Sequence, residues 1–414
     1  MRARLIGYRS IPWLVLLVVS LLATPARAAR TRRSSRGAAS QEAPAVPLSD
    51  IHVFGDRPAP FALDAKSAMM VDQQTGAVLY SYNEHARMQP ASLAKIMTFY
   101  LVLDALAQKR ITLDTMMPIS EQAWRLSMDQ SVSRMFLGVG QKVAVRDLLF
   151  GLMVSSGNDA AVALSEYLGG SADGFTTQMN AKAAELGLSD THFSNPDGLP
   201  VEGEYTTAAD MVKLGCDLLR CHPEALTYTG AKDFTFDKIK QPNFNTLLFY
   251  DARVDGIKTG HVEEAGYHLV ASARSNGMVL VSAVMGTPSS EKRRVETGKL
   301  IDWAFRTFAT AKPDAHKVMP ATVPVFYGVA DTVAIAPAHE TCVTVGKGEE
   351  GKIDVAWNPA ARYVSAPVAK GTGVGQLAVT QDGKQIDSIP VVTQAPVQRA
   401  GFFKRLADHF RRVR

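Results

Sequence analysis

Cysteine is scarce in this sequence, and its spacing matches no metal site. The three cysteines, Cys216, Cys221 and Cys342, are an odd number, and no pair of histidines forms the H-E-x-x-H pattern of a zinc hydrolase. Cys216 and Cys221 are five residues apart in one expected helix, which is a poor placement for a disulfide. We therefore expect free thiols, no catalytic metal and no cofactor.

The sequence also lacks a hydrophobic run that would span a bilayer comfortably. The run at residues 11–22 follows a basic start with three arginines and precedes Ala26-Arg27-Ala28, a small-x-small cleavage pattern. We interpret residues 1–28 as a signal peptide that is removed on export, with a retained anchor as the alternative. Residues 29–48 are rich in Arg, Ser, Ala and Pro and lack periodicity, so we expect a disordered leader.

Positive charge is concentrated at the ends of the chain. The formal net charge is +5, whereas residues 1–28 carry +4, residues 29–44 carry +3 and residues 399–414 carry +5, so the body between the ends is acidic. Because the body is acidic, we do not expect a nucleic-acid partner. In the last segment, apolar residues recur at helical spacing with basic residues between them: Phe402, Phe403, Leu406, Phe410 and Val413. A basic amphipathic helix is expected to lie on an anionic inner-membrane surface; the alternative is a terminal helix packed on the body.

The order of strand-like and helical patterns predicts an α/β (α+β) domain over residues 49–312. Apolar runs with turn residues between them predict hairpins at 68–81 and at 265–285, the second one around an Asn-Gly turn. Helical patterns dominate residues 90–230, and a closing helix is expected near 299–310. An antiparallel sheet built from both ends, with a helical insert between them, accounts for this order.

Residues 313–396 have a different texture, which predicts a small all-β sandwich domain. Short strand-like runs are interrupted there by glycine, proline and Asp382-Gly383, and no long helical pattern is present. The basic helix at 397–414 follows this domain.

The segment Ser92-Leu93-Ala94-Lys95 combines a hydroxyl and an amine on one face of an expected helix. It follows Pro90 and opens a run, residues 93–106, that is apolar on nearly every side, as in a core helix. Burial disfavours a charged lysine, so the neutral amine of Lys95 could take the proton of Ser92. The alternative is a lysine that reaches the surface, and residues 289–292 match the same pattern by chance.

The segment Ser156-Gly157-Asn158 lies between two helical stretches, where a loop can present side chains to a cleft. Ser156 is expected to relay a proton to a leaving amine, and Asn158 to hold a peptide carbonyl and orient Lys95. The alternative is an ordinary helix C-cap followed by an N-cap. The pattern is weak alone, because Ser81-Tyr82-Asn83 matches it too.

The segment Lys258-Thr259-Gly260 lies in a strand-like stretch. Lys258 and Thr259 offer a charge and a hydroxyl to a carboxylate, and Gly260 would let a ligand backbone approach closely. The alternative is an ordinary edge strand that carries a lysine. Together the three segments supply a nucleophile, a base, a second hydroxyl and a second cation, which suits acyl transfer through a serine ester.

These segments resemble those of the D-alanyl-D-alanine carboxypeptidases, the low-molecular-mass penicillin-binding proteins. The likeness extends from residues 90–98 through 155–160 and 195–199 to 254–261. It implies a β-lactamase-like α/β domain followed by a β-sandwich, with Ser92 as the nucleophile, Lys95 as the base and Ser156 as an assisting residue. It also implies a set of substrate-binding residues, with the backbone N–H groups of Ser92 and His261 as the oxyanion hole: Asn158, Lys258, Thr259, Gly260, His261 and Arg293.

The resemblance implies a serine-type carboxypeptidase that trims the terminal D-alanine from peptidoglycan pentapeptides, on the periplasmic side of the bacterial inner membrane. β-Lactam antibiotics would mimic the substrate and acylate Ser92. The alternatives are a class A β-lactamase, a D,D-endopeptidase that cuts cross-links, and a weakly active penicillin-binding scaffold. The β-lactamase alternative lacks support because no E-x-x-L-N-like segment is present to supply a deacylating glutamate. One departure from some relatives, Phe244 in a region where they carry an arginine, bears on carboxylate binding.

Overall fold

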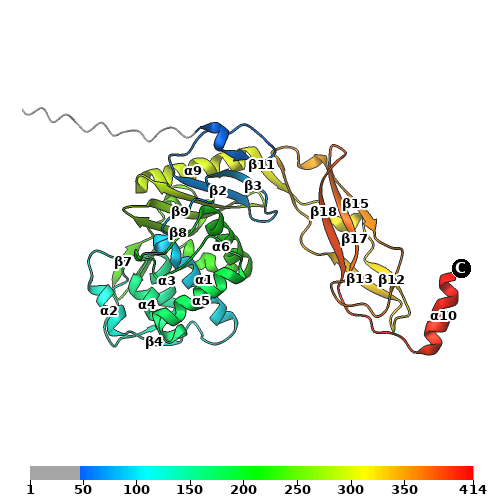
Figure 1. The fold of residues 1–414 in the computed structure, drawn as a ribbon, viewed down its shortest axis with the longest axis horizontal. Coiled ribbons are helices and arrows are strands. Elements are labelled where there is room, and N and C mark those ends of the chain that lie inside the picture. The colour runs from blue at the N-terminus through cyan, green and yellow to red at the C-terminus, as the bar shows by residue number, and fades with distance from the viewer. Residues whose placement is uncertain (1–46, 414) are drawn as a thin grey trace, which may run out of the picture. The chain divides into compact units, whose positions relative to one another are not determined.

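A computed structural model describes residues 47–413 of the chain. The predicted signal peptide and nearly all of the predicted leader lie outside the described residues. Along the described chain, a mixed α/β part is followed by an all-β part and then by a terminal helix (Figure 1). The expected fold class is confirmed.

The α/β part is built on one antiparallel sheet with the strand order β1-β3-β2-β10-β9-β8. Both predicted hairpins are confirmed, as β2–β3 and β9–β10. β10 pairs with β2, so strands from the two ends of this part lie side by side in the middle of the sheet. The strands are β1 (His52–Val53), β2 (Ser67–Asp72), β3 (Val78–Tyr82), β8 (Val254–Val262), β9 (Gly266–Ser275) and β10 (Met278–Thr287).

The segment between the two hairpins is mostly helical, as predicted. Its helices are α1 (Ala94–Ala107), α2 (Glu121–Met128), α3 (Val145–Met153), α4 (Asn158–Gly169), α5 (Ala172–Glu185), α6 (Ala208–Cys221), α7 (Leu226–Thr229) and α8 (Leu247–Tyr250). Two small two-stranded antiparallel sheets accompany them, β4 (Met116–Pro118) with β5 (Lys142–Ala144) and β6 (Asp233–Phe236) with β7 (Ile239–Pro242).

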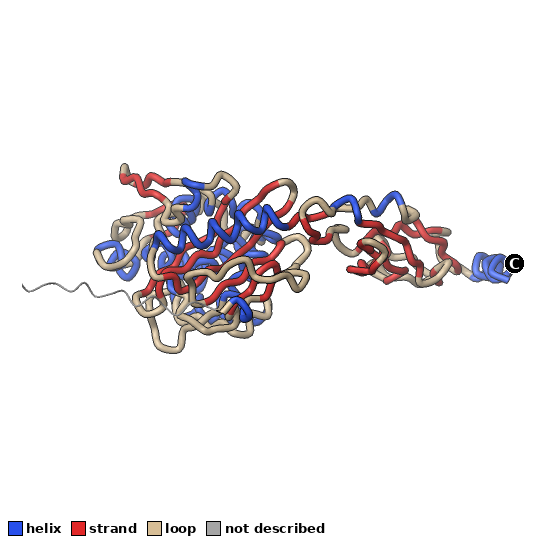
Figure 2. The backbone as a smooth tube through the Cα atoms, turned by 90° about the horizontal axis from the view of Figure 1, so that it is seen from above, coloured by secondary structure: helices blue, strands red, loops and turns tan. Residues whose placement is uncertain are grey.

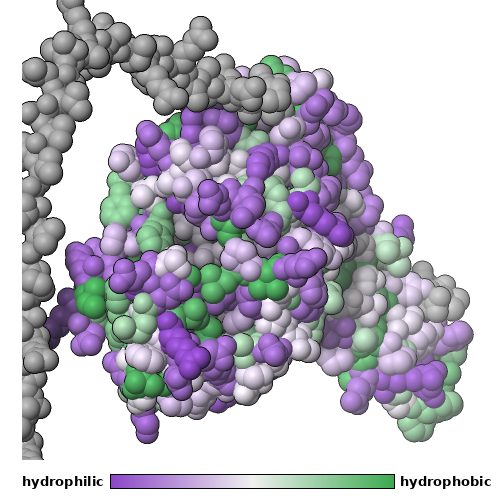
Figure 3. Space-filling model, turned by 60° about the vertical axis from the view of Figure 1, so that its left-hand side comes forward, coloured by the Kyte–Doolittle hydropathy of each residue, from purple (hydrophilic) through white to green (hydrophobic). Residues whose placement is uncertain are grey.

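Both faces of the sheet are covered, which explains why β10 is buried at every position. Successive strand residues point to opposite faces. Accordingly, Val281 packs in the apolar core beneath the helical segment, while its neighbour Leu280 packs in a second core with Leu300 and Trp303 of α9. On the side of the molecular surface drawn in Figure 3, hydrophilic and apolar residues are interspersed.

The closing helix, α9 (Ser290–Thr307), begins well before the predicted start near residue 299, so that boundary is wrong. Ser289 caps α9 by accepting a hydrogen bond from the backbone N–H of Lys292 at 3.0 Å. The chance S-x-x-K match at residues 289–292 is therefore a helix cap. Apart from the buried Arg293, the first turn of α9 is polar and exposed, so no apolar stripe marks its start in the sequence.

The part that follows α9 contains strands and no long helix before the terminal one, as expected (Figure 2). Its main sheet has the order β15-β17-β18-β13-β12-β16, and a separate pair joins β11 to β14. The strands are β11 (Phe308–Ala311), β12 (Thr322–Phe326), β13 (Thr332–Pro337), β14 (Val343–Gly346), β15 (Ile353–Pro359), β16 (Val364–Ser365), β17 (Gly373–Gln381) and β18 (Lys384–Thr393).

The predicted terminal helix is α10 (Phe402–Val413). Among the described residues, no helix combines the length and the apolar character needed to cross a membrane. All three cysteines are free thiols, as expected, and Cys216 and Cys221 do share a helix, α6.

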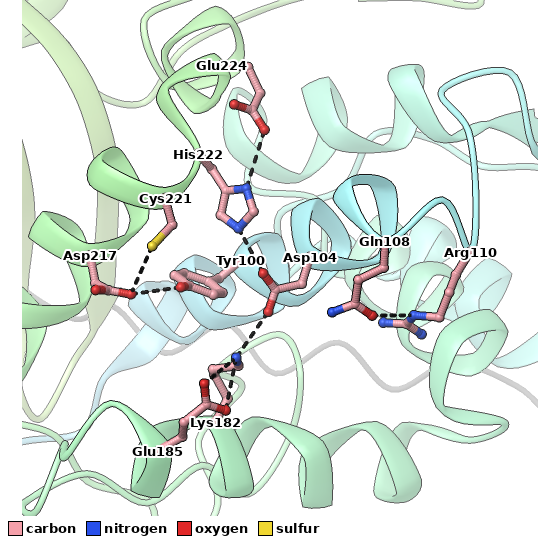
Figure 4. Close-up of polar contacts among 10 residues, drawn as sticks. All are labelled: Tyr100, Asp104, Gln108, Arg110, Lys182, Glu185, Asp217, Cys221, His222 and Glu224. Carbon is pink, nitrogen blue, oxygen red and sulfur yellow. Dashed lines mark hydrogen bonds and ion pairs between the residues drawn. The ribbon is translucent and has the colours of Figure 1, made fainter. Parts of the chain in front are cut away.

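The end of α1 that lies away from the S-x-x-K segment is held by a polar cluster (Figure 4). The hydroxyl of Tyr100 donates to Asp217 of α6 at 2.7 Å. Asp104 contacts Nε2 of His222 at 2.9 Å and Nζ of Lys182, from α5, at 3.2 Å. These contacts join α1 to α5 and to the end of α6, so they help to fix where α1 lies.

Replacing Tyr100 by Phe should lower the free energy of unfolding by about 1–2 kcal/mol, because it removes a buried hydrogen bond to a carboxylate. Glu185→Gln, an exposed change in the same cluster, should lower it by less than about 0.5 kcal/mol. Urea unfolding of both variants measures the difference. Equal stabilities of Tyr100→Phe and the wild type would contradict a stabilising role for this hydrogen bond.

Candidate active site

Ser92 lies in a tight 3₁₀ turn, Ala91–Leu93, that continues directly into α1. The residue before it, Ala91, has φ of +49°, a left-handed conformation that is uncommon outside glycine. Such strain persists where the surroundings hold the backbone, and it is frequent at active sites. The sequence predicts a helix start at Ser92, and the structure refines it to a turn that precedes the helix.

Two glycines allow other segments to approach this turn. A Cβ atom on Gly198 would lie 1.9 Å from the carbonyl oxygen of Ala91, and one on Gly260 would lie 3.0 Å from that of Pro90. At Gly260 the chain's own nucleophile turn approaches closely, and the approach of a ligand backbone there stays a prediction. Glycine at both positions allows the third motif and the loop after α5 to close around Ser92.

The amine of Lys95 is fully buried and touches three oxygen atoms. Its Nζ lies 3.0 Å from Oγ of Ser92 and 2.5 Å from Oδ1 of Asn158, and it donates to the main-chain carbonyl of Asp197. The two carbonyl oxygens can only accept, so they engage two N–H bonds. A neutral amine has two N–H bonds and one lone pair, and the lone pair is then left for the hydroxyl of Ser92.

Burial lowers the pKa of Lys95 to about 8, against the opposing effect of nearby carboxylates, Asp197 first among them. Lys258 is also fully buried, and burial, with the charges of Lys95 and Arg293, lowers its pKa well below the usual range. A lysine with a pKa near 8 is neutral in a substantial fraction of molecules at physiological pH. It is therefore able to act as a proton acceptor there.

The second and third motifs meet through a hydrogen bond. Nζ of Lys258 donates to Oγ of Ser156 at 3.0 Å and to the carbonyl oxygen of Thr259 at 3.0 Å. Ser156 has φ of +56°, a second left-handed residue in the site. Because Asn158 contacts Lys95, the three motifs form one continuous set of polar contacts.

The loop that carries the second motif is fixed by Asp159, a fully buried residue at the start of α4. Its carboxylate accepts hydrogen bonds from the hydroxyl of Ser127 at 2.6 Å and from backbone N–H groups of Met135 and Leu137. The N–H of Asn158 donates to the carbonyl oxygen of Ser133 at 2.9 Å. These bonds hold the wall of the site rigid, as preorganised catalysis requires.

Arg293, from α9, reaches the same end of the site and is 6% exposed. Its guanidinium donates to the carbonyl oxygens of Gly260 and Phe244, both at 3.3 Å. No ion pair joins it to a carboxylate in the described part of the chain, and burial lowers its pKa to about 10. A buried guanidinium without a counter-ion provides a binding position for an anion.

These groups surround a cavity of about 520 Å³. Lys95 and Lys258 lie behind its wall, and each contacts a serine in the wall. Because β8 is an edge strand of the sheet, its free edge is available to a ligand. The other predicted site residues line the cavity: Ser92, Ser156, Asn158, Thr259, Gly260, His261 and Arg293.

Comparisons with known proteins identify the family. A family model described as D-alanyl-D-alanine carboxypeptidase matches residues 55–289, and one described as penicillin-binding protein 5, C-terminal domain, matches residues 305–399. The chain belongs to the D-alanyl-D-alanine carboxypeptidase family. It is a serine peptidase of that family, and the resemblance inferred from the motifs is confirmed.

Individual relatives cover most of the chain. D-alanyl-D-alanine carboxypeptidase DacA of Haemophilus influenzae is 39% identical over 84% of this chain and 89% of the relative. DacC of Escherichia coli is 38% identical over 84% of this chain and 88% of the relative. The crystal structure of penicillin binding protein 5 from Haemophilus influenzae matches with a TM-score of 0.74 and 38% identity, covering 82% of this chain and 99% of that one.

Sequence reasoning missed two residues beside the base. Asp197 accepts a hydrogen bond from Lys95 through its backbone oxygen, which no side-chain pattern reveals. Glu204 is buried, and neither of its carboxylate oxygens has a partner among the described residues. Burial raises the pKa of Glu204 to about 8, so it is largely uncharged at neutral pH. In the sequence, the turn-rich segment 195–200 next to a helical pattern is the feature that could have indicated a functional loop here.

Acylation by a labelled penicillin should rise with pH and level off above about pH 8, because only the neutral amine of Lys95 accepts the proton of Ser92. Well below that value, each unit of pH should lower the rate about tenfold. The second-order rate of labelling between about pH 6 and 9.5 measures this. Lys95→Arg, which stays charged, should not be labelled at any pH. A flat profile would contradict a neutral lysine base.

Proposed function

We propose that this chain removes the terminal D-alanine from peptidoglycan pentapeptides through an acyl-enzyme on Ser92. The observation that supports this most directly is the placement of the Lys95 amine, whose lone pair is left for Ser92 once two carbonyl oxygens engage its N–H bonds. The relatives named D-alanyl-D-alanine carboxypeptidase support the choice of substrate.

In the proposed acylation step, Oγ of Ser92 attacks the carbonyl carbon of the penultimate D-alanine as Lys95 takes its proton. The negative charge that develops on the carbonyl oxygen is stabilised by the backbone N–H groups of Ser92 and His261, both in the cavity wall. The proton reaches the leaving amine through Ser156, whose hydroxyl contacts Lys258. D-Alanine departs, and the peptide stays attached to Ser92 as an ester.

Hydrolysis of the ester completes the proposed cycle. A water molecule enters the space left by D-alanine, gives a proton to the same base and attacks the ester carbonyl, which regenerates Ser92. The substrate's free carboxylate lies near Thr259 and Arg293, where the buried guanidinium has no counter-ion among the described residues.

Incubating purified peptidoglycan fragments with the wild type should remove one alanine from pentapeptides, and Ser92→Ala should leave them unchanged. Mass spectrometry of the fragments measures the product. Cleavage of cross-linked dimers by the wild type would favour the endopeptidase instead. A chain that changes neither substrate but is labelled by penicillin would be a scaffold.

We also propose that β-lactams acylate Ser92 as substrate mimics. In support, penicillin-binding protein D2 from Listeria monocytogenes, solved with cefotaxime bound, is 33% identical with a TM-score of 0.55 over 60% of this chain and all of that one.

Export across the inner membrane is proposed from the basic, apolar and small-x-small pattern of residues 1–28.

Peripheral attachment to the periplasmic side of the inner membrane is proposed through α10. Its apolar side chains remain largely exposed in the structure, with Phe403 at 85% and Phe410 at 66%. A helix that exposes aromatic residues beside basic ones is suited to the interface of an anionic bilayer.

Deleting residues 399–414 should release the exported protein from the membrane to the soluble fraction without loss of penicillin labelling. The reason is that the segment contributes exposed aromatic side chains and cations but no residue of the cavity at Ser92. Sedimentation of membranes followed by labelling of both fractions measures it. Continued sedimentation of the truncated protein would contradict attachment through α10.

A further inference from the structure

We propose that a pocket between α10 and the all-β part binds the phosphate of an anionic phospholipid headgroup. This inference rests on the proposed membrane attachment and assigns it a specific contact. The pocket has a volume of about 250 Å³, and it is lined by Tyr327, Arg399, Phe402, Arg405, Leu406 and His409.

One side of α10 packs against the all-β part. Asp408 is 3% exposed and accepts a hydrogen bond from the backbone N–H of Tyr327 at 2.8 Å. Lys404, one turn earlier, pairs with Asp331 at 2.9 Å and donates to the carbonyl oxygen of Val329 at 3.2 Å. Residues four apart lie on one side of a helix, so these contacts fix which side of α10 is turned outward.

The exposed aromatic stripe lies on the opposite side. At 100° per residue, Phe403 and Phe410 project away from the Lys404–Asp408 side, which agrees with their large exposed fractions. Arg405 and His409 fall on the border between the two sides. When the aromatic stripe enters the acyl boundary of a bilayer, this border lies at the level of the headgroup phosphates.

The cations of this region are not equivalent. Lys404 is paired with Asp331, and Arg411 lies 4.0 Å from Asp408. Arg399 and Arg405 have no ion pair with any described carboxylate, and both line the pocket. The Nε atom of Arg405 is buried and lacks a hydrogen-bond partner among the described residues.

An unpaired N–H group buried in the wall of a pocket is costly unless a ligand satisfies it. The planar guanidinium presents N–H groups in a fork that matches two phosphate oxygens. Two unpaired arginines that line one pocket therefore favour an anion with several oxygen atoms. The adjoining Phe402 and Leu406, 64% and 46% exposed, would contact the acyl chains of the same lipid, which distinguishes a lipid from a free anion.

Flotation of residues 29–414 with vesicles measures this contact. The vesicles contain phosphatidylcholine alone or with about 30% phosphatidylglycerol, whose headgroup phosphate carries a net negative charge. Wild-type protein should float with the anionic vesicles. Arg405→Gln and Arg399→Gln should each weaken binding by more than tenfold. Arg411→Gln removes the same charge at a position on α10 that does not line the pocket, and it should cost only about fivefold, the worth of one non-specific surface charge.

The variant Arg405→Lys tests the planar guanidinium separately from the positive charge. It should bind more weakly than the wild type but more tightly than Arg405→Gln, because it keeps the charge and loses the two-pronged contact. Penicillin labelling of every variant, expected at the wild-type rate, verifies that each protein is folded.

Three results would overturn the proposal, each for a different reason. Equal losses for Arg405→Gln and Arg411→Gln would mean that α10 senses only surface charge. Binding of glycerol 3-phosphate, measured without vesicles, that is as tight as binding to the anionic vesicles would mean that the pocket takes a free phosphate. Failure of the wild type to float with either vesicle would overturn the membrane attachment itself.

Discussion

The chemistry of this protein depends on keeping one amine buried and directed at one hydroxyl. No carboxylate within residues 47–413 contacts the amine of Lys95; two carbonyl oxygens and Ser92 surround it instead. Carbonyl groups satisfy its N–H bonds without supplying a full negative charge, so burial can lower its pKa to about 8. A direct ion pair would have stabilised the charged form and removed its capacity as a base. A further buried acid near the amine, Glu204, is itself kept largely neutral by burial.

The surrounding fold supplies the groups around this amine from widely separated segments. α1 carries Lys95, the start of α4 carries Asn158, and the loop after α5 carries Asp197. α1 and α4 are anchored independently of the amine: α1 through the Tyr100–Asp217 contact, and α4 through the backbone N–H groups that donate to the carboxylate of Asp159. Removing the amine's partners would therefore leave the backbone in place, whereas loosening an anchor would misplace the amine.

The sequence was sufficient for the parts of the structure that side-chain pattern encodes. Both hairpins of the main sheet were predicted from apolar runs with turn residues between them, in one case an Asn-Gly turn. The three motifs, taken in their order along the chain, identified the family. The start of α9 was misplaced because its exposed, charged first turn carries no periodic signal. Asp197 was missed because it acts through a backbone carbonyl, and the Gly260–Pro90 approach because it is a distance between segments far apart in the chain.

The same rule, that a buried donor needs a partner, relates the two ends of the protein. In the catalytic cavity, Arg293 is buried without a counter-ion, and the proposed substrate brings a carboxylate to it. Beside α10, Arg405 has a buried N–H group without a partner, and the proposed partner is a lipid phosphate. In each place neighbouring cations are already engaged within the chain, Lys258 by Ser156 and Lys404 by Asp331. In each place the arginines without a carboxylate partner among the described residues line a cavity, which is the arrangement expected where binding energy is reserved for a ligand.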